Sequence, residues 1–181
     1  MGNRQASSPR NIGICSLHTS INHIKPKMKI SKPALIALLL WVVTIAMFGW
    51  FFIHGKTTVG TDGRTAVVLQ ASERDLVLSE MRGMLAATQG VLEGANQGDM
   101  QGIIKAASAA GMRVAADGNP ALMEKLPIEV KTLGLSVHRD MDEIAKAAAS
   151  GTPAPEILKM LSNTLTKCVA CHSTWQLKAE N

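Results

Sequence analysis

The longest uninterrupted apolar stretch of the chain runs from Pro33 to Ile53. Its 21 residues carry no charged side chain. As a helix they would span about 31 Å, which is close to the hydrocarbon thickness of a bilayer. Trp50 lies near the C-terminal end of the run, where an indole ring can sit at headgroup depth. We therefore expect residues 33–53 to form one transmembrane helix.

The charges that flank this run predict its orientation. Lys25, Lys27, Lys29 and Lys32 precede it, whereas Lys56 follows it. The positive-inside rule then places residues 1–32 in the cytoplasm and the chain after residue 54 outside. A cleaved signal peptide is the main alternative, but the run ends in FGWFFIHG, a poor match to the A-x-A-like site that cleavage needs. We therefore expect an uncleaved signal anchor in a bacterial inner membrane, with the C-terminal domain in the periplasm.

The segments on either side of the anchor differ in character. Residues 1–27 are polar, and translation that starts at Met28 is an alternative in which they, together with Cys15, His18 and His23, would be absent. Residues 54–71 begin with the Gly/Thr-rich sequence HGKTTVGTDG and are expected to be a linker. Residues 72–181 remain for one domain, and no strand is expected in it.

From residue 72 onward, apolar residues recur every three or four positions, as in amphipathic helices. The breaks in this pattern predict four helices. The first covers residues 72–94, with a capping box at Ser72 and Asp75, and the second covers residues 99–116, with Asp99 as N-cap. The third runs from Pro127 to about 150, and the fourth begins at Pro153. Short links favour an antiparallel four-helix bundle. The predicted fold class is therefore all-α, a four-helix bundle after one transmembrane helix. The expected inward face of the first helix is Leu78, Met81, Leu85, Thr88 and Leu92, and that of the fourth is Leu158, Leu161, Leu165, Cys168 and His172.

The net charge of +5 is distributed unevenly along the chain. Residues 1–60 hold seven Lys or Arg and no acidic residue, whereas residues 61–181 hold twelve Lys or Arg and all fourteen acidic residues. The basic character thus belongs to the N-terminal arm, and no basic stripe with stacking aromatics indicates nucleic-acid binding. No Ser/His/Asp set or phosphate-binding loop is present, so we do not expect an enzyme.

The motif Cys168-Val169-Ala170-Cys171-His172 carries the candidate chemistry. C-x-x-C-H is the signature of covalent haem attachment, in which two thiols form thioethers with the haem vinyl groups and the histidine binds the iron. On a helix these positions are i, i+3 and i+4, so the three side chains share one face. A redox dithiol is the first alternative, although no βαβ unit surrounds the motif. Half of a zinc site is the second, and it would need a further ligand.

One C-x-x-C-H in the last helix of a helical chain resembles the cytochrome c-prime family, over about residues 70–177. The resemblance implies one haem c held by Cys168 and Cys171, with His172 as the proximal ligand, and it suggests a homodimer. The family is usually soluble, so the anchor is a departure. The resemblance also implies that the first helix faces the distal side of the haem. That helix offers Met81, with Leu78 on the same stripe and Met84 at its edge.

The sixth iron ligand separates two functional hypotheses. Met81 as ligand implies a membrane-anchored electron carrier for redox partners of a respiratory chain. An open iron, or one covered by Leu78, implies binding of NO or CO for scavenging or sensing. His138 is a further candidate ligand, but its neighbours Arg139 and Asp140 indicate a solvated position. A non-haem helical module remains as a third hypothesis.

Overall fold

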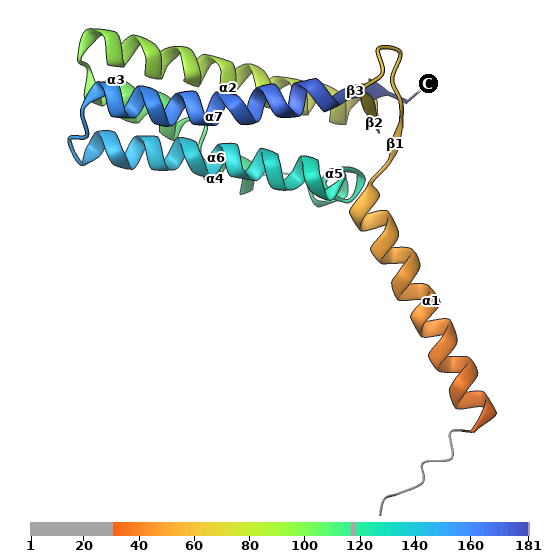
Figure 1. Cartoon of the computed structure of the whole chain (residues 1–181). Helices are drawn as coiled ribbons and strands as arrows, with labels where there is room; N and C mark the ends of the chain where they lie inside the picture. The colour runs from red at the N-terminus through yellow and green to blue at the C-terminus, as the bar shows by residue number, and fades with distance from the viewer. Residues whose placement is uncertain (1–30, 117–118, 181) are drawn as a thin grey trace, which may run out of the picture.

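The computed structural model describes residues 31–116 and 119–180. One long helix, α1 (Lys32–His54), precedes a helical body (Figure 1). The body consists of α2 (Ala71–Gln97), α3 (Met100–Ser108), α4 (Met112–Ala116), α5 (Pro120–Lys125), α6 (Ile128–Ala149) and α7 (Ala154–Thr174). Strands β1 (Thr57–Val59), β2 (Thr65–Leu69) and β3 (Trp175–Ala179) complete the described part. The expectation of a mostly helical chain is confirmed.

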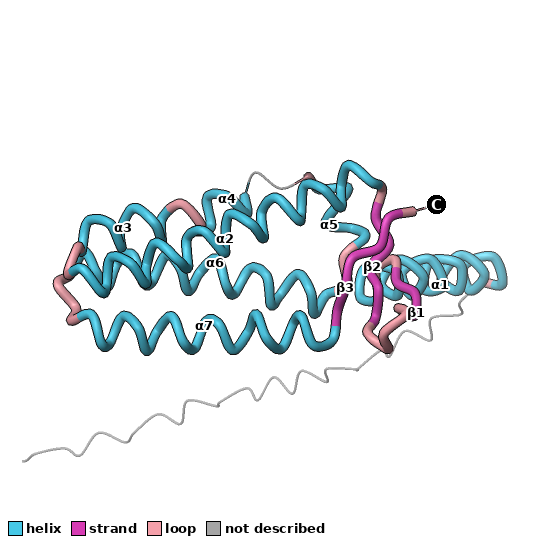
Figure 2. Tube along the Cα trace, turned by 90° about the horizontal axis from the view of Figure 1, so that it is seen from above, coloured by secondary structure: helices cyan, strands magenta, loops and turns pink. Residues whose placement is uncertain are grey.

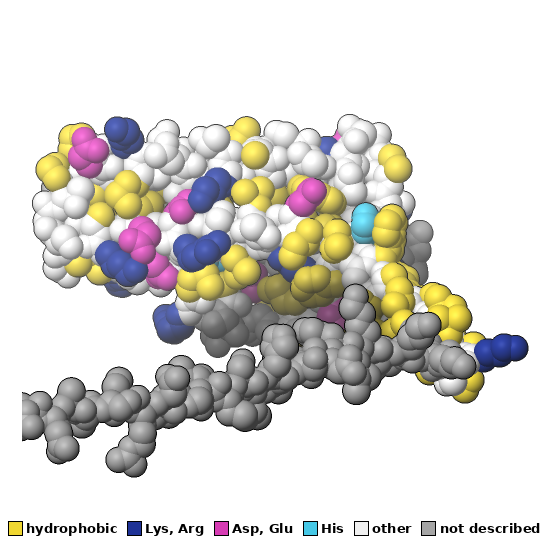
Figure 3. All heavy atoms as spheres, turned by 60° about the horizontal axis from the view of Figure 1, so that its bottom comes forward, with side chains coloured by type: hydrophobic (Ala, Val, Ile, Leu, Met, Phe, Trp, Pro, Cys, Tyr) yellow, Lys and Arg dark blue, Asp and Glu magenta, His cyan; other side chains and the backbone are white. Residues whose placement is uncertain are grey.

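Helix α1 extends away from the body, and none of its residues is buried (Figure 1). It has 23 residues and is long and apolar enough to cross a membrane. Its C-terminal turn meets the body at α5 and α6. Figure 3 shows apolar side chains gathered at that end of the body, while charged groups of both signs are scattered over the rest of the face in view.

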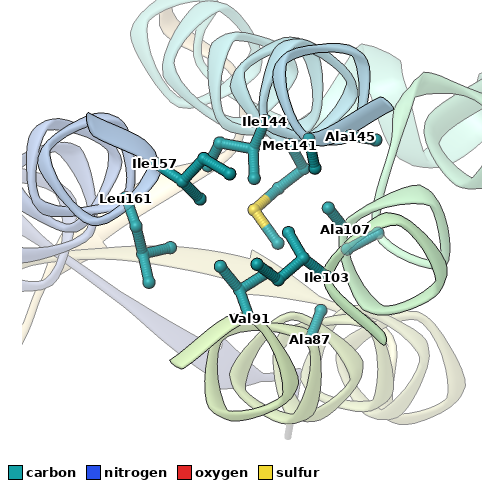
Figure 4. Packing of buried hydrophobic residues seen from close by; sticks show 11 residues of the cluster. Ala87, Val91, Ile103, Ala107, Met141, Ile144, Ala145, Ile157 and Leu161 are labelled. Atoms are coloured by element: carbon teal, nitrogen blue, oxygen red, sulfur yellow. The ribbon is translucent and has the colours of Figure 1, made fainter. Parts of the chain in front are cut away.

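Helices α2, α3, α6 and α7 lie side by side, and each packs against its neighbours around one core (Figures 1 and 4). The Met141 side chain lies in the middle of this core. Its buried members are Ala87, Val91, Ile103, Ala107, Ala110, Met141, Ile144, Ala145, Ala148, Ile157 and Leu161. They occupy the half of the body that is remote from α1 and the strands, which we call the sealed half.

Small residues decide which side of α2 faces inward. A Cβ at Gly90 would lie 2.7 Å from the Ala106 Cβ, and one at Gly94 would lie 2.8 Å from Ile103, so α2 and α3 approach closely at these glycines. Ala87, Val91 and Gly94 are the buried residues of α2. The predicted inward face of this helix is therefore wrong. Leu85, which it included, is 70% exposed.

Three strands form a small sheet in the order β1-β2-β3 (Figure 2). β1 and β2 pair antiparallel, and β3 pairs parallel to β2, with Thr65 opposite Trp175. β2 has the sequence TAVVL, whose β-branched residues favour a strand. Its buried residues form a second apolar cluster with α5: Val67, Leu69, Leu122 and Leu126, packed by Trp175 and Leu177. The prediction of no strand is wrong, and part of the expected linker belongs to this sheet.

The helix ends agree with the sequence in part. Asp99 caps α3 as expected, since its Oδ1 accepts a hydrogen bond of 2.9 Å from the Gly102 N–H. The predicted second helix is broken into α3 and α4, and the expected capping box at Ser72 is wrong. The box lies two residues earlier, at Gln70 and Glu73. Sequence spacing alone could not distinguish these two registers.

Candidate functional site

The motif 168–172 lies in the last turns of α7, with its two thiols on the inward side. The buried or half-buried positions of α7 include 157, 161, 164, 168 and 171, which share one side of the helix. Cys168 and Cys171 are both half-buried and form no disulfide. His172 is exposed, one position past the inward side. The expectation that Leu165 and His172 continue the inward face of this helix is therefore wrong.

The surroundings of the two thiols favour their protonated form. Burial raises the pKa of Cys168, and the Asp140 carboxylate adds to that effect. Burial also raises the pKa of Cys171, with a smaller contribution from Cys168. The Cys168 Sγ–H donates a weak hydrogen bond of 3.6 Å to the Thr164 carbonyl. Redox-active C-x-x-C pairs normally have a lowered thiol pKa, so this environment does not favour the redox dithiol alternative.

Asp140 links α6 to α7 one turn before the motif. Its Oδ2 accepts a hydrogen bond of 3.2 Å from the Thr164 hydroxyl and lies 2.6 Å from the Lys167 Nζ. These contacts mark the side of α6 that faces α7. His138 precedes Asp140 by two residues and so lies on the opposite side of α6. Its Nδ1 is 2.8 Å from the Ala110 carbonyl, at the end of α3. This placement is unfavourable for a ligand to an iron held by α7.

An apolar surface, here called the α2–α7 face, lies beside the motif. Helical geometry places Leu85 and Leu92 on the side of α2 away from the glycines that contact α3. The same geometry places Leu165 and Val169 on the side of α7 away from Lys167, and His172 shares that side. The α2–α7 face consists of Met81, Leu85, Leu165 and Val169, and all but Met81 are exposed.

The two methionines of α2 are one helical turn apart but have different surroundings. Met84 packs against the buried cluster of the sealed half. Met81 is nine residues before Gly90, which places it half a turn around the helix from the contact with α3. Met81 thus shares a side with Leu85, and it is half-buried. Met81, the candidate sixth ligand, is therefore directed away from the sealed core. The prediction that it lies on the inward face of α2 is wrong.

A residue that the sequence analysis missed, Arg64, contacts the motif. It lies between β1 and β2, and its Nη1 donates hydrogen bonds to the carbonyls of His172 at 3.0 Å and Trp175 at 3.3 Å. The Arg64 Nη2 also lies 2.6 Å from Asp62, whose Oδ1 accepts a bond of 2.8 Å from the Gln176 amide. The hairpin thereby supplies donors to the C-terminal end of α7. The turn sequence TDGR was the signal that could have revealed it.

These residues suit covalent haem better than a metal held by side chains alone. Within residues 31–116 and 119–180, no group of three or more His, Cys, Asp or Glu side chains could hold a metal ion. Haem attachment needs no such group, because the porphyrin supplies four of the iron ligands. It needs two unpaired thiols one helical turn apart, an adjacent imidazole and apolar surface for the ring. Cys168, Cys171 and His172 meet the first two requirements, and exposed apolar side chains such as Val169 lie on the same turns of α7.

Several candidates lie outside the described residues, namely Cys15, His18, His23 and the alternative start at Met28. Comparison of the chain with protein-family models, with curated proteins and with solved structures gives no match.

Proposed function

We propose that the protein is a membrane-anchored c-type cytochrome that transfers electrons on the periplasmic side of a bacterial inner membrane. The observation that carries the proposal is the placement of Cys168, Cys171 and His172 in the last turns of α7, beside the exposed α2–α7 face. Large exposed apolar side chains are costly unless something covers them. Haem has a large apolar ring that could cover these side chains, and the motif would attach it beside them.

Each residue has a distinct role in this proposal. Cys168 and Cys171 would hold the haem through thioether bonds, and His172 would bind its iron. The bound haem supplies a one-electron ferric/ferrous couple. Arg64 fixes the backbone of His172 through the carbonyl bond described above, which positions the imidazole. Met81 would supply a second protein ligand to the iron, and the apolar residues around it would exclude water.

The fold supports the same interpretation. Helices α2, α3, α6 and α7 surround one core, with a C-x-x-C-H in the last of them. We propose that they form a four-helix bundle of the cytochrome c-prime kind, to which the sheet and the anchor are added. Helix α1 then confines the carrier to the membrane surface, within reach of redox partners of a respiratory chain.

Binding of NO or CO at an open iron is the second candidate function. The observation that favours it is that Leu78 lies on the same side of α2 as Met81, again by its position relative to Gly90. Leu78 carries no donor atom, so an iron facing it would keep one coordination position for a gas.

An optical spectrum of the full-length haem protein, recorded with and without carbon monoxide, tests the proposal. An iron bound by His172 and Met81 should be low-spin in both oxidation states and should bind carbon monoxide slowly or weakly, because the thioether must first leave. A high-spin iron that binds carbon monoxide at once would overturn the electron-carrier function and support gas binding.

A further inference from the structure

The C-terminal end of α1 is fixed directly to the helical body. Gly55 ends the helix with a φ of +62°, and a Cβ there would lie 2.4 Å from the Lys125 carbonyl oxygen. Only glycine allows both this conformation and this close approach. The next residue, Lys56, donates its N–H to the same carbonyl at 2.8 Å. The body therefore begins within one residue of the membrane-spanning helix, without a flexible tether.

Lys131 on α6 contacts the last turns of α1. Its Nζ lies 3.9 Å from the centre of the Phe52 ring and 3.3 Å from the Phe52 carbonyl oxygen. The residue is only 9% exposed, and burial lowers the pKa of the ammonium group, while Glu124 opposes that change. An ammonium has three donor hydrogens. Within the described residues only one hydrogen bond, the long one to the Phe52 carbonyl, uses them.

A shallow, largely apolar hollow lies beside this ammonium group. Its volume is about 470 Å³. The lining residues are Phe52, Ala115, Pro120, Met123, Glu124, Lys131 and Leu135. Phe52 is two residues before the end of α1, a helix whose 23 residues span about 34 Å. In the bilayer that α1 is proposed to cross, this turn lies where phospholipid headgroups lie.

We propose that this hollow binds one anionic phospholipid, with its phosphate on the Lys131 ammonium and its acyl chains along α1. The position of the hollow at the end of α1, its apolar walls and a desolvated cation with donors to spare all match a lipid at the membrane surface. The bound lipid, together with the contacts of Gly55 and Lys56, fixes the orientation of the body relative to the membrane. Glu124 also lines the hollow, and its negative charge weakens the attraction for the phosphate. Removal of that charge should therefore strengthen lipid binding.

The experiment compares the full-length protein, solubilised in a mild detergent, with phosphatidylglycerol and phosphatidylcholine of equal chain length in native mass spectrometry. We expect the wild type to retain phosphatidylglycerol preferentially. Lys131→Gln should reduce that preference about tenfold, and Lys131→Arg should restore most of it. Glu124→Gln should increase the preference, because the opposing carboxylate is gone. Lys146→Gln, on an exposed residue of the same helix, is the matched control and should leave it unchanged.

Three results would overturn the proposal. One is equal retention of the two lipids by the wild type. Another is a Glu124→Gln protein with unchanged preference, a variant that removes no hydrogen bond or ion pair seen in the structure. The third is displacement of bound lipid by a neutral isoprenoid quinone with no dependence on lipid charge, which would make the hollow a quinone site. None of these readouts depends on the haem.

Discussion

The two halves of the helical body differ in how far their apolar side chains are covered. In the sealed half, Val91, Met141 and Ile157 have no exposed surface. In the half that carries the motif, the cluster around Val67 and Leu69 is also buried, but Leu85 is 70% exposed and Val169 is 66% exposed, although both are large and apolar. The same helices, α2 and α7, pass through both halves. The difference therefore arises from side chains and not from a change of fold.

This contrast separates stability from chemistry. A core without exposed surface stabilises the helices by burial and close packing. The motif half leaves apolar area beside two thiols and an imidazole, which is the arrangement that a covalently attached apolar cofactor would cover. We infer that the sealed half holds the helices in register so that the motif half can accept haem.

The largest expected effect is on cofactor attachment. Cys168→Ala combined with Cys171→Ala should abolish covalent haem completely, because no thioether can form, while the sealed half keeps its helices. Haem staining of the denatured protein measures attachment, and circular dichroism measures helix content. Cys15→Ala is the control and should change neither. Full haem staining of the double variant would place the attachment elsewhere.

The next largest effect distinguishes two methionines of one helix turn. Met81→Ala should convert a low-spin iron into a high-spin form that binds carbon monoxide, because the sixth ligand is lost. Met84→Ala should leave the spectrum unchanged, since Met84 packs against the sealed core. Optical and near-infrared spectra of the two proteins provide the measurement. A spectral change confined to Met84→Ala would assign the sixth ligand to Met84 instead of Met81.

Substitutions in the sealed core and on the α2–α7 face should differ in their effect on the free energy of unfolding. Met141→Ala removes a fully buried side chain and should cost about 2–5 kcal/mol. Leu85→Ala in the haem-free protein should change stability by about 0.5 kcal/mol or less, as at other exposed positions. Urea unfolding monitored by circular dichroism measures both. With haem attached, Leu85→Ala should become clearly more destabilising, and an unchanged cost would mean that haem does not cover this face.

The smallest expected effect is a change in how the stability of the fold depends on pH in the acid range. The Lys125 ammonium, 2.6 Å away, lowers the pKa of Glu73 in the folded protein, and the Gln70 N–H adds to the shift. A carboxyl group with a lowered folded pKa contributes stability that is complete above its ordinary pKa. That stability should decline as the pH falls through the lowered value. Glu73→Gln should remove this part of the acid sensitivity in thermal melts between neutral and acid pH, and an identical acid profile would contradict the assignment.

The sequence predicted helices well because periodicity and end signals are local. α2, α6 and α7 lie within a few residues of their expected bounds, and Asp99 caps α3 as the sequence indicated. The apolar run 33–53 is almost coextensive with α1. In each case the signal lies within one short stretch of chain, so no tertiary contact was needed to interpret it.

The sequence failed where tertiary packing decided. We expected the largest apolar residues of α2 to face inward, but Gly90 and Gly94 let α3 approach so closely that small residues form its core face. β3 could not be predicted because Trp175–Ala179 becomes a strand only by pairing with β2, more than a hundred residues earlier. The contact of Arg64 with His172 has the same cause. The motif itself was identifiable, because its five residues are consecutive in the sequence and need no tertiary contact to be recognised.

The most direct test of the central claim is whether haem remains bound when the fold is lost. The full-length protein is produced with a bacterial haem-attachment system, denatured in acid and extracted with organic solvent, and the mass of the polypeptide is then measured. The account predicts that the solvent stays colourless and that the polypeptide is heavier by one haem, a mass increase that Cys168→Ala with Cys171→Ala removes. Extraction of all the haem, leaving a polypeptide of unmodified mass, would contradict it.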